Sequence, residues 1–165
     1  MKKNSAFIKE QYGLNVVNIS AEEFDTKEKF DAITMIEFIE HLADPMAVIH
    51  KARDLLKPEG HIFINTPNVK SWSAFLSGKR WWLYKPNEHL YHFSPRTIQR
   101  LLETEGFKVL LIKKLSRKRN LLTVVDRLSN YSKISSKLIK LVISPYILKR
   151  ILINLSVGGH ICCGK

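Results

Sequence analysis

Three ionisable side chains, Glu37, Glu40 and His41, lie close together in the sequence. They follow an apolar run of strand length, residues 30–36, and precede the Asp-Pro pair at residues 44–45, which is typical of a helix start. A short apolar run between turn signals indicates a buried parallel strand. Ligands of open α/β sheets bind just outside the carboxyl ends of such strands. We therefore expect the chemistry of this chain near residues 37–41.

A further histidine, His89, lies in an aromatic-rich stretch, residues 69–93, which follows the next predicted strand. A long irregular segment over strand ends is typical of a lid or a substrate wall. The alternative is a surface loop that packs its aromatic side chains as a small separate core. Because an imidazole in a substrate wall is a candidate base, we take His89 and His41 as candidate catalytic residues, with a purely structural histidine as the alternative.

The elements that must position these side chains predict an α/β fold. An amphipathic helix over residues 45–56 connects the strands 30–36 and 61–65, and a strand–helix–strand unit of this length makes its two strands parallel. Shorter patterns predict helices at 3–12 and 94–106 and strands at 14–19 and 107–112.

The basic charge of the chain is concentrated in its C-terminal third. Of the net charge of +12, residues 1–112 contribute little, with 15 Lys and Arg against 14 Asp and Glu, whereas residues 113–165 hold 12 Lys and Arg and a single acid, Asp126. Apolar runs over 120–155 predict two helices separated at residues 144–145. Lysines and arginines interrupt them, so no membrane-spanning run of about 20 apolar residues exists.

These patterns divide the chain into a core over 1–112, a basic amphipathic helical insertion over 113–157 and a closing strand over 158–165. The insertion predicts a peripheral contact with anionic membrane, or alternatively a cover for the sheet or for a partner subunit. The basic residues of the insertion alone, without a recognisable nucleic-acid-binding motif, do not predict nucleic-acid binding. The adjacent cysteines at 162 and 163 and the lack of a leader segment predict a cytoplasmic protein. If the insertion contacts a membrane, the protein would lie at the inner face of that membrane.

Residues 30–45 resemble the fourth-strand region of class I S-adenosylmethionine-dependent methyltransferases, and the similarity continues through residues 55–60, 62–68 and 89–94. It covers residues 6–112 and the final strand. The resemblance implies a Rossmann-like sheet in the family order 3-2-1-4-5-7-6. Only strands three to seven are matched, because the chain contains neither the family's first two strands nor its Gly-x-Gly-x-Gly loop. An incomplete sheet predicts that residues 1–24 are poorly anchored or pair directly with residues 30–36.

The resemblance also implies a cofactor site for S-adenosylmethionine. The residues it places beside the adenine are Ser20, Ala21 and Glu22, with Ser20 where the family often has an acid. Those it places beside the ribose and the methionine portion are Met35, Ile36 and Glu37.

Residues 37–41 match a Glu-x-x-Glu-His pattern that ligates magnesium in quinone-biosynthetic relatives. Carboxylates suit that ion, but histidine is an unusual third ligand. The alternative is that Glu37 faces the cofactor while Glu40 and His41 begin a helix, and the sequence assigns no metal.

The function implied is methyl transfer by in-line displacement to a small-molecule or lipid-linked acceptor, with catalysis by positioning and exclusion of water. The alternative is a catalytically inactive fragment or an interaction subunit that lacks half of the cofactor site. In that case a partner chain would supply the missing strands.

Overall fold

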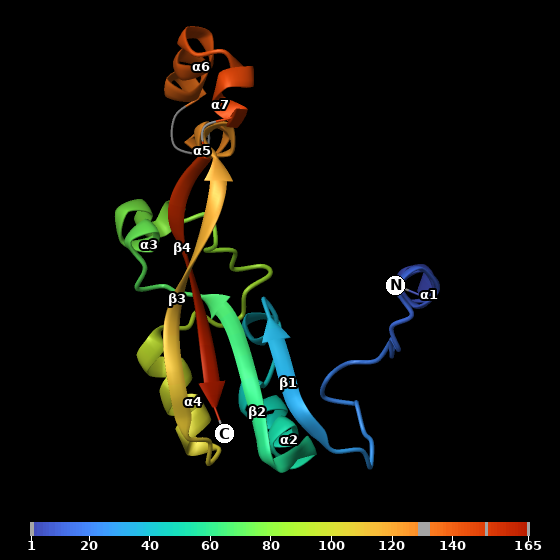
Figure 1. The fold of residues 1–165 in the computed structure, drawn as a ribbon. Coiled ribbons are helices and arrows are strands. Elements are labelled where there is room, and N and C mark those ends of the chain that lie inside the picture. The colour runs from blue at the N-terminus through green and yellow to red at the C-terminus, as the bar shows by residue number, and fades with distance from the viewer. Residues whose placement is uncertain (1, 129–132, 151, 165) are drawn as a thin grey trace.

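The computed structural model of this chain describes residues 2–128, 133–150 and 152–164. Its centre is a four-stranded mixed sheet in the order β1-β2-β4-β3, formed by β1 (Phe30–Ile36), β2 (Leu56–Pro67), β3 (Val109–Asn120) and β4 (Leu152–Gly164). Strands β1 and β2 are parallel, as predicted, and β4 is antiparallel to both β2 and β3 (Figure 1). The α/β fold predicted from the sequence is confirmed.

Two helices cover the core part of the sheet and begin where the sequence predicts. Helix α2 (Pro45–Leu55) is capped by Asp44, whose carboxylate accepts a hydrogen bond from the Ala47 backbone N–H. Helix α4 (Pro95–Thr104) begins with a capping box between Ser94 and Thr97. Their apolar faces pack with the sheet into a single core that contains the fully buried Ile39, Ile49, Ile62, Ile98 and Leu102.

The N-terminal segment departs from the prediction. Helix α1 (Lys2–Tyr12) forms and ends at Gly13, whose φ of +66° suits a helix C-terminus. The predicted strand over 14–19 is wrong, because these residues lie outside any strand and their large apolar side chains are exposed. A β-branched run becomes a strand only beside a pairing neighbour, and none of the described strands lies next to it.

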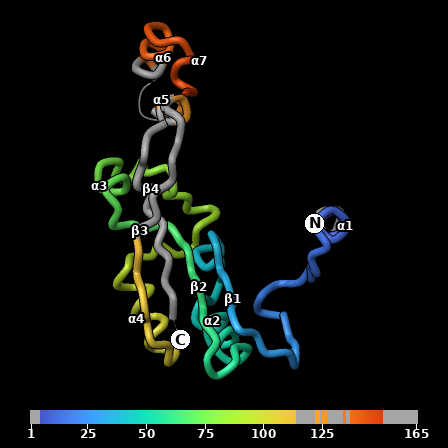
Figure 2. The backbone as a smooth tube through the Cα atoms, viewed as in Figure 1, coloured from blue at the N-terminus to red at the C-terminus, as the bar shows by residue number. Residues whose placement is uncertain are grey.

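Figures 1 and 2 show α1 lying apart from the sheet. Residues 1–24 were expected either to be poorly anchored or to pair with residues 30–36. The second alternative is wrong, since none of the described residues of this segment pairs with β1.

Strands β3 and β4 run further than the sequence predicts. Beyond the core they continue as a two-stranded antiparallel arm, with pairs from Arg117↔Leu155 to Asn120↔Leu152. The basic residues after 112 were placed outside the strand because of their charge. The strand continues there because β4 runs beside it and pairs with its backbone. Charged side chains do not prevent such backbone hydrogen bonds.

Three helices, α5 (Leu121–Leu128), α6 (Lys133–Val142) and α7 (Pro145–Arg150), form the tip of this arm (Figure 1). The break between α6 and α7 falls where it was predicted, and α5 is an additional helix. These helices contact one another and β3, and Figure 1 shows them at the end of the arm, away from the core part of the sheet. In the described part of the chain, every helix is too short or too polar to cross a membrane.

Candidate functional site

The carboxyl ends of β1 and β2 meet at one edge of the sheet, where hydrogen bonds join them. The backbone N–H of Glu37 donates to the carbonyl oxygen of Asn65 at 2.8 Å, and the Asn65 side-chain amide lies 3.4 Å from Oε1 of Glu37. Glu37 itself is exposed and has a φ of +50°, a left-handed conformation that side chains other than glycine rarely adopt. The chain therefore turns sharply at the strand end that the sequence singled out.

Glu40 lies in a short 3-10 helix, η1 (Ile39–His41), that follows this turn. Its side chain is 1% exposed. Oε2 accepts a hydrogen bond of 2.9 Å from the Thr66 hydroxyl, while Oε1 is buried and has no hydrogen-bond partner among the described residues. A buried carboxylate oxygen without a partner is costly, so this position needs a positive or hydrogen-bonding group.

The two candidate catalytic histidines lie together. The rings of His41 and His89 meet edge to face with their centroids 4.8 Å apart, although 48 positions separate them in the sequence. Residues 88–91 are held against η1 by backbone N–H groups of Leu90 and Tyr91, which donate to the Glu40 carbonyl oxygen at 2.9 and 3.1 Å. His89 is buried, whereas His41 is exposed.

Each of these imidazoles is oriented by a backbone carbonyl group. Nδ1 of His41 lies 2.7 Å from the Glu88 carbonyl oxygen, and Nδ1 of His89 lies 2.9 Å from that of Leu83. A carbonyl oxygen only accepts, so Nδ1 carries the proton in both rings. In the neutral rings Nε2 therefore has a free lone pair, which can accept a proton or bind a metal.

In the aromatic segment 69–93 the alternative of a small separate core is confirmed, and a role as a lid or substrate wall stays a prediction. Trp81 and Leu83 are buried with Ala74 of α3 (Trp72–Ser77) as a small separate core, whereas Trp72 and Phe75 are exposed. Just beyond this core, burial lowers the pKa of His92, and the neighbouring His89 lowers it further. The buried part fixes the position of His89 over the strand ends.

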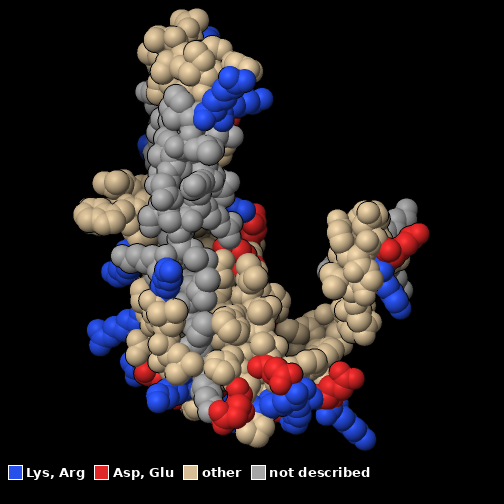
Figure 3. Space-filling model, viewed as in Figure 1, with Lys and Arg blue, Asp and Glu red and all other residues tan. Residues whose placement is uncertain are grey.

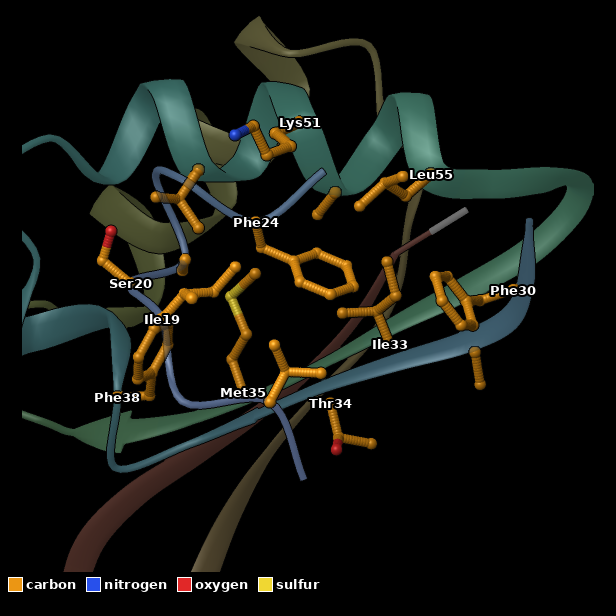
Figure 4. A pocket seen from close by; sticks show the side chains of 15 residues that line it. Ile19, Ser20, Phe24, Phe30, Ile33, Thr34, Met35, Phe38, Lys51 and Leu55 are labelled. Atoms are coloured by element: carbon orange, nitrogen blue, oxygen red, sulfur yellow. The ribbon is translucent and has the colours of Figure 1, made fainter. Parts of the chain in front are cut away.

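A cavity of about 460 Å³ lies beside β1, between α2 and residues 17–24. Figure 4 shows Ile33 and Met35 of β1 and Phe24 pointing into this space below α2, with Ser20 at one end. Of the residues predicted to bind the cofactor, Ser20, Ala21 and Met35 line the cavity. These three come from two separate segments that the fold brings together.

The other predicted site residues lie elsewhere. The cavity lining does not include Glu22, Ile36, Glu37, His41 or His89. Glu22 instead lies on the exposed surface, where its carbonyl oxygen accepts a hydrogen bond from Lys51 Nζ, and Ile36 is 64% exposed. The structure thus separates the three candidates that line the cavity, Ser20, Ala21 and Met35, from the histidine pair at the strand ends.

The sequence did not single out three residues that matter here. Phe24 and Phe38 wall the cavity, but in the sequence they carry no signal beyond being apolar. Thr66, which donates to Glu40, lies at the carboxyl end of the second parallel strand, so the rule that places ligands at such ends points to it as well.

The lining of the cavity fits one end of S-adenosylmethionine. Its mostly apolar walls suit an adenine ring. Three of the described lining residues have side chains that can form hydrogen bonds, namely Ser20, Thr34 and Lys51. Among the described lining residues there is no carboxylate for the ribose hydroxyls. The residues present thus fit the adenine end of the cofactor, and the ribose end has no partner among them.

A family model described as a methyltransferase domain matches residues 4–112. Ubiquinone biosynthesis O-methyltransferases are similar over shorter stretches. The protein of that name from Histophilus somni is 43% identical over 36% of this chain and 29% of its own length, and the one from Bartonella bacilliformis is 37% identical over 52% of this chain and 37% of its own length. The chain thus spans about a third of the length of these curated relatives.

Solved structures share the fold. A SAM-dependent methyltransferase from Thermotoga maritima, described as a possible histamine N-methyltransferase, aligns with 99% of this chain and 69% of its own at a TM-score of 0.60 and 17% identity. Another from Archaeoglobus fulgidus aligns with 98% of this chain and 72% of its own, with a TM-score of 0.59 and 23% identity. The Rossmann-like architecture of the sheet is therefore confirmed.

Proposed function

The chain belongs to the methyltransferase domain family, and from that premise we propose that it takes part in methyl transfer from S-adenosylmethionine to an oxygen of a small-molecule acceptor. The observation that carries the proposal is the match over residues 4–112, which includes both strand ends of the candidate site. The relatives named ubiquinone biosynthesis O-methyltransferase support an oxygen as the acceptor atom.

In this proposal the chain works by holding its ligands and excluding water. The cofactor supplies a methyl group on a sulfonium, whose departure needs no proton. Ser20 and Ala21 hold the adenine end in the cavity beside β1, and Met35, which lines the same cavity, lies toward the ribose and the methionine portion. The segment around the buried His89 covers the strand ends and keeps water from the acceptor, and the cluster of Glu40, His41 and His89 takes up the hydroxyl proton of the acceptor.

The first test is calorimetric titration of the chain with S-adenosylhomocysteine. Ala21→Trp fills the cavity and should abolish binding, while Glu22→Gln, outside the lining, should leave the affinity unchanged. Saturation at about 100 times the dissociation constant should stabilise the chain by about 2.7 kcal/mol, measurable as a thermal shift. Circular dichroism of each variant controls for folding. A folded wild-type chain that gives neither heat nor shift contradicts cofactor binding by this chain.

That negative result would support the alternative function, an interaction subunit. The observation behind it is that β1 lies at an edge of the described sheet, with β2 as its pairing neighbour. An open strand edge favours addition of a strand from another segment or chain. In this alternative, a partner strand at β1 completes the cofactor site.

We also propose that the tip of the arm contacts an anionic membrane surface on the cytoplasmic side. The tip exposes six large apolar side chains on α6 and α7, namely Ile134, Leu138, Leu141, Val142, Tyr146 and Ile147. Lysines and arginines lie beside them (Figure 3), and the guanidinium of Arg150 stacks over the Tyr146 ring at 4.5 Å. Apolar faces flanked by cations suit the boundary between headgroups and acyl chains, where each cation near the surface contributes about 1 kcal/mol. A lipid-linked acceptor would be reached from this position.

Co-sedimentation with vesicles tests the contact. Binding should require anionic lipid and weaken at high salt, because the Debye length falls from about 10 Å at 0.1 M to about 3 Å at 1 M. Leu141→Glu should reduce binding, and Phe7→Glu, an equally drastic change of an exposed apolar residue on α1, should not. Equal binding to neutral vesicles, or equal loss in both variants, contradicts the proposal.

A further inference from the structure

Residues 14–19 have the composition of a strand but no pairing neighbour in the described part of the chain. Three of the six are β-branched and none is charged, and the backbone groups of the run make no hydrogen bond with another described residue. The large apolar side chains are between 37% and 57% exposed, namely Leu14, Val16, Val17 and Ile19. The run therefore leaves both its backbone and its apolar side chains to solvent.

The outer edge of β1 has the complementary deficiency. Strand β1 lies at one edge of the described sheet, so its outward N–H and C=O groups lack a ladder partner there. Native edge strands are usually protected by charges, prolines or bulges. The charge and the irregularity of β1 both lie at its start, where Asp31 pairs with Lys57 and the register shifts. Residues 32–36 contain no charge and no proline, and Ile36 is 64% exposed.

The segment that carries the unpaired run extends from the body of the molecule. Residues 2–19, here called the N-terminal extension, include α1, which lies apart from the sheet (Figures 1 and 2). The extension ends where Phe24 enters the cavity and the carbonyl oxygen of Glu22 accepts a hydrogen bond from Lys51. On α1 the rings of Phe7 and Tyr12 are themselves exposed. Each copy of the chain thus offers a strand-forming run and an open edge that it does not pair with each other.

We propose that two copies of this chain form a symmetric dimer in which residues 14–19 of each copy add to the β1 edge of the other. Backbone hydrogen bonds hold an added strand, and its alternate side chains set the register. A two-fold exchange uses both elements of both copies, so the assembly closes at two. The second copy is then the strand donor of the alternative function, and its addition does not depend on methyl transfer.

The surfaces involved suit this partner in charge and in size. Residues 11–21 and 32–36 contain no Lys, Arg, Asp or Glu, although the chain carries a net charge of +12. Since a fully covered aromatic side chain buries about 150–250 Å², the exposed parts of the six large apolar side chains of the extension amount to roughly 500 Å². Each extension covers a similar area of the other copy. The exchange thus buries roughly 1,000 Å² per copy, above the roughly 800 Å² per partner of a standard interface.

The test is sedimentation equilibrium of the full chain, where we expect a monomer–dimer equilibrium. Neighbouring N–H groups of a strand point to opposite sides, so either Val16→Pro or Val17→Pro removes a bond to β1 in any register. That variant should weaken dimerisation by about tenfold or more, because the bond is lost at both junctions. The control Lys27→Pro, at an exposed residue outside any helix or strand, should leave the dissociation constant unchanged. A monomer at every concentration, equal weakening by Lys27→Pro, or a dimer that tolerates both valine variants overturns the proposal.

Hydrogen exchange on the unaltered chain covers the case in which the proline variants fail to fold. Peptides that contain residues 14–19 and 32–36 should gain protection above the dissociation constant and lose it on dilution. Protection confined to residues 133–150 would mean that the copies meet through the apolar tip of the β3–β4 arm, and it overturns the assignment. Both measurements are made without cofactor or acceptor. Failure of the exchange is therefore distinguishable from failure of the proposed function, which the titration with S-adenosylhomocysteine tests.

Discussion

The left-handed backbone at Glu37 predicts an unusual order of stability for two variants. At a φ of +50°, an L-residue with a Cβ pays about 1–2 kcal/mol that glycine does not pay. Glycine loses more chain entropy on folding, at a cost of about 0.5–1 kcal/mol. Glu37→Gly and Glu37→Ala both remove every contact of the carboxylate. The difference between their free energies of unfolding therefore reports only the cost of the backbone conformation at this position. We expect the glycine variant to be more stable than the alanine variant by about 0.5–1 kcal/mol.

Urea unfolding followed by circular dichroism measures this difference, and thermal unfolding should show it as about 2–4 °C per kcal/mol for a chain of this size. The matched control is the same pair at Arg100, an exposed residue in the interior of helix α4. In a helix interior glycine costs about 1 kcal/mol relative to alanine, so the order must reverse there. If Glu37→Ala equals or exceeds Glu37→Gly while the Arg100 pair behaves as stated, the turn at the end of β1 is not strained.

Three further predictions concern the elements that support the site. A methyl group at Gly60 would lie 2.9 Å from a leucine side-chain carbon and 3.0 Å from two backbone carbonyl oxygens, so Gly60→Ala should lower the free energy of unfolding by about 1–3 kcal/mol in urea titrations; an unchanged midpoint would contradict this packing. Ile49→Ala should cost about 2–5 kcal/mol because Ile49 is fully buried, and Met46→Ala on the exposed side of α2 should cost far less; similar losses would place the core elsewhere. The hydrogen bond from Lys57 lowers the pKa of Asp31, so Lys57→Gln should raise that pKa in an NMR titration. Since the pKa of Asp31 in the folded chain is below its ordinary value of 3.8, the ion pair stabilises the fold above pH 3.8. This stabilisation is lost as the pH falls through the folded pKa.

The sequence predicted best what depends on local chemistry. The bounds of β1 agree with the predicted run 30–36, and the caps at Asp44 and Ser94 form as predicted, because a cap needs only a side-chain oxygen and the next backbone N–H groups. The parallel pairing of β1 and β2 also followed from the sequence. When a helix of that length connects two neighbouring strands of one sheet, the common arrangement of the two strands is parallel.

The failures concern contacts between distant residues. Residues 14–19 have the composition of a strand, yet a strand is a property of a pair, and the neighbour is not among the described elements. The same dependence lengthened β3, which continues past Lys113 because β4 runs beside it. At the site, a local five-residue pattern put Glu37 with Glu40, whereas the backbone bonds of residues 90–91 bring in His89 from 49 positions away.

The edge of β1 links the two main features of this molecule, its cavity and its sheet. Met35 and Ile33 of β1 wall the cavity, and β1 lies at the edge of the described sheet opposite β3. A strand that pairs with β1 would satisfy its outer N–H and C=O groups and would at the same time close the side of the cavity. If pairing raises the affinity for a ligand in the cavity by some factor, the ligand must raise the affinity for the pairing strand by the same factor. If a ligand in the cavity and a strand at this edge both bind, their affinities form one coupled equilibrium, in which S-adenosylhomocysteine is a probe of the edge and a pairing strand is a probe of the cavity.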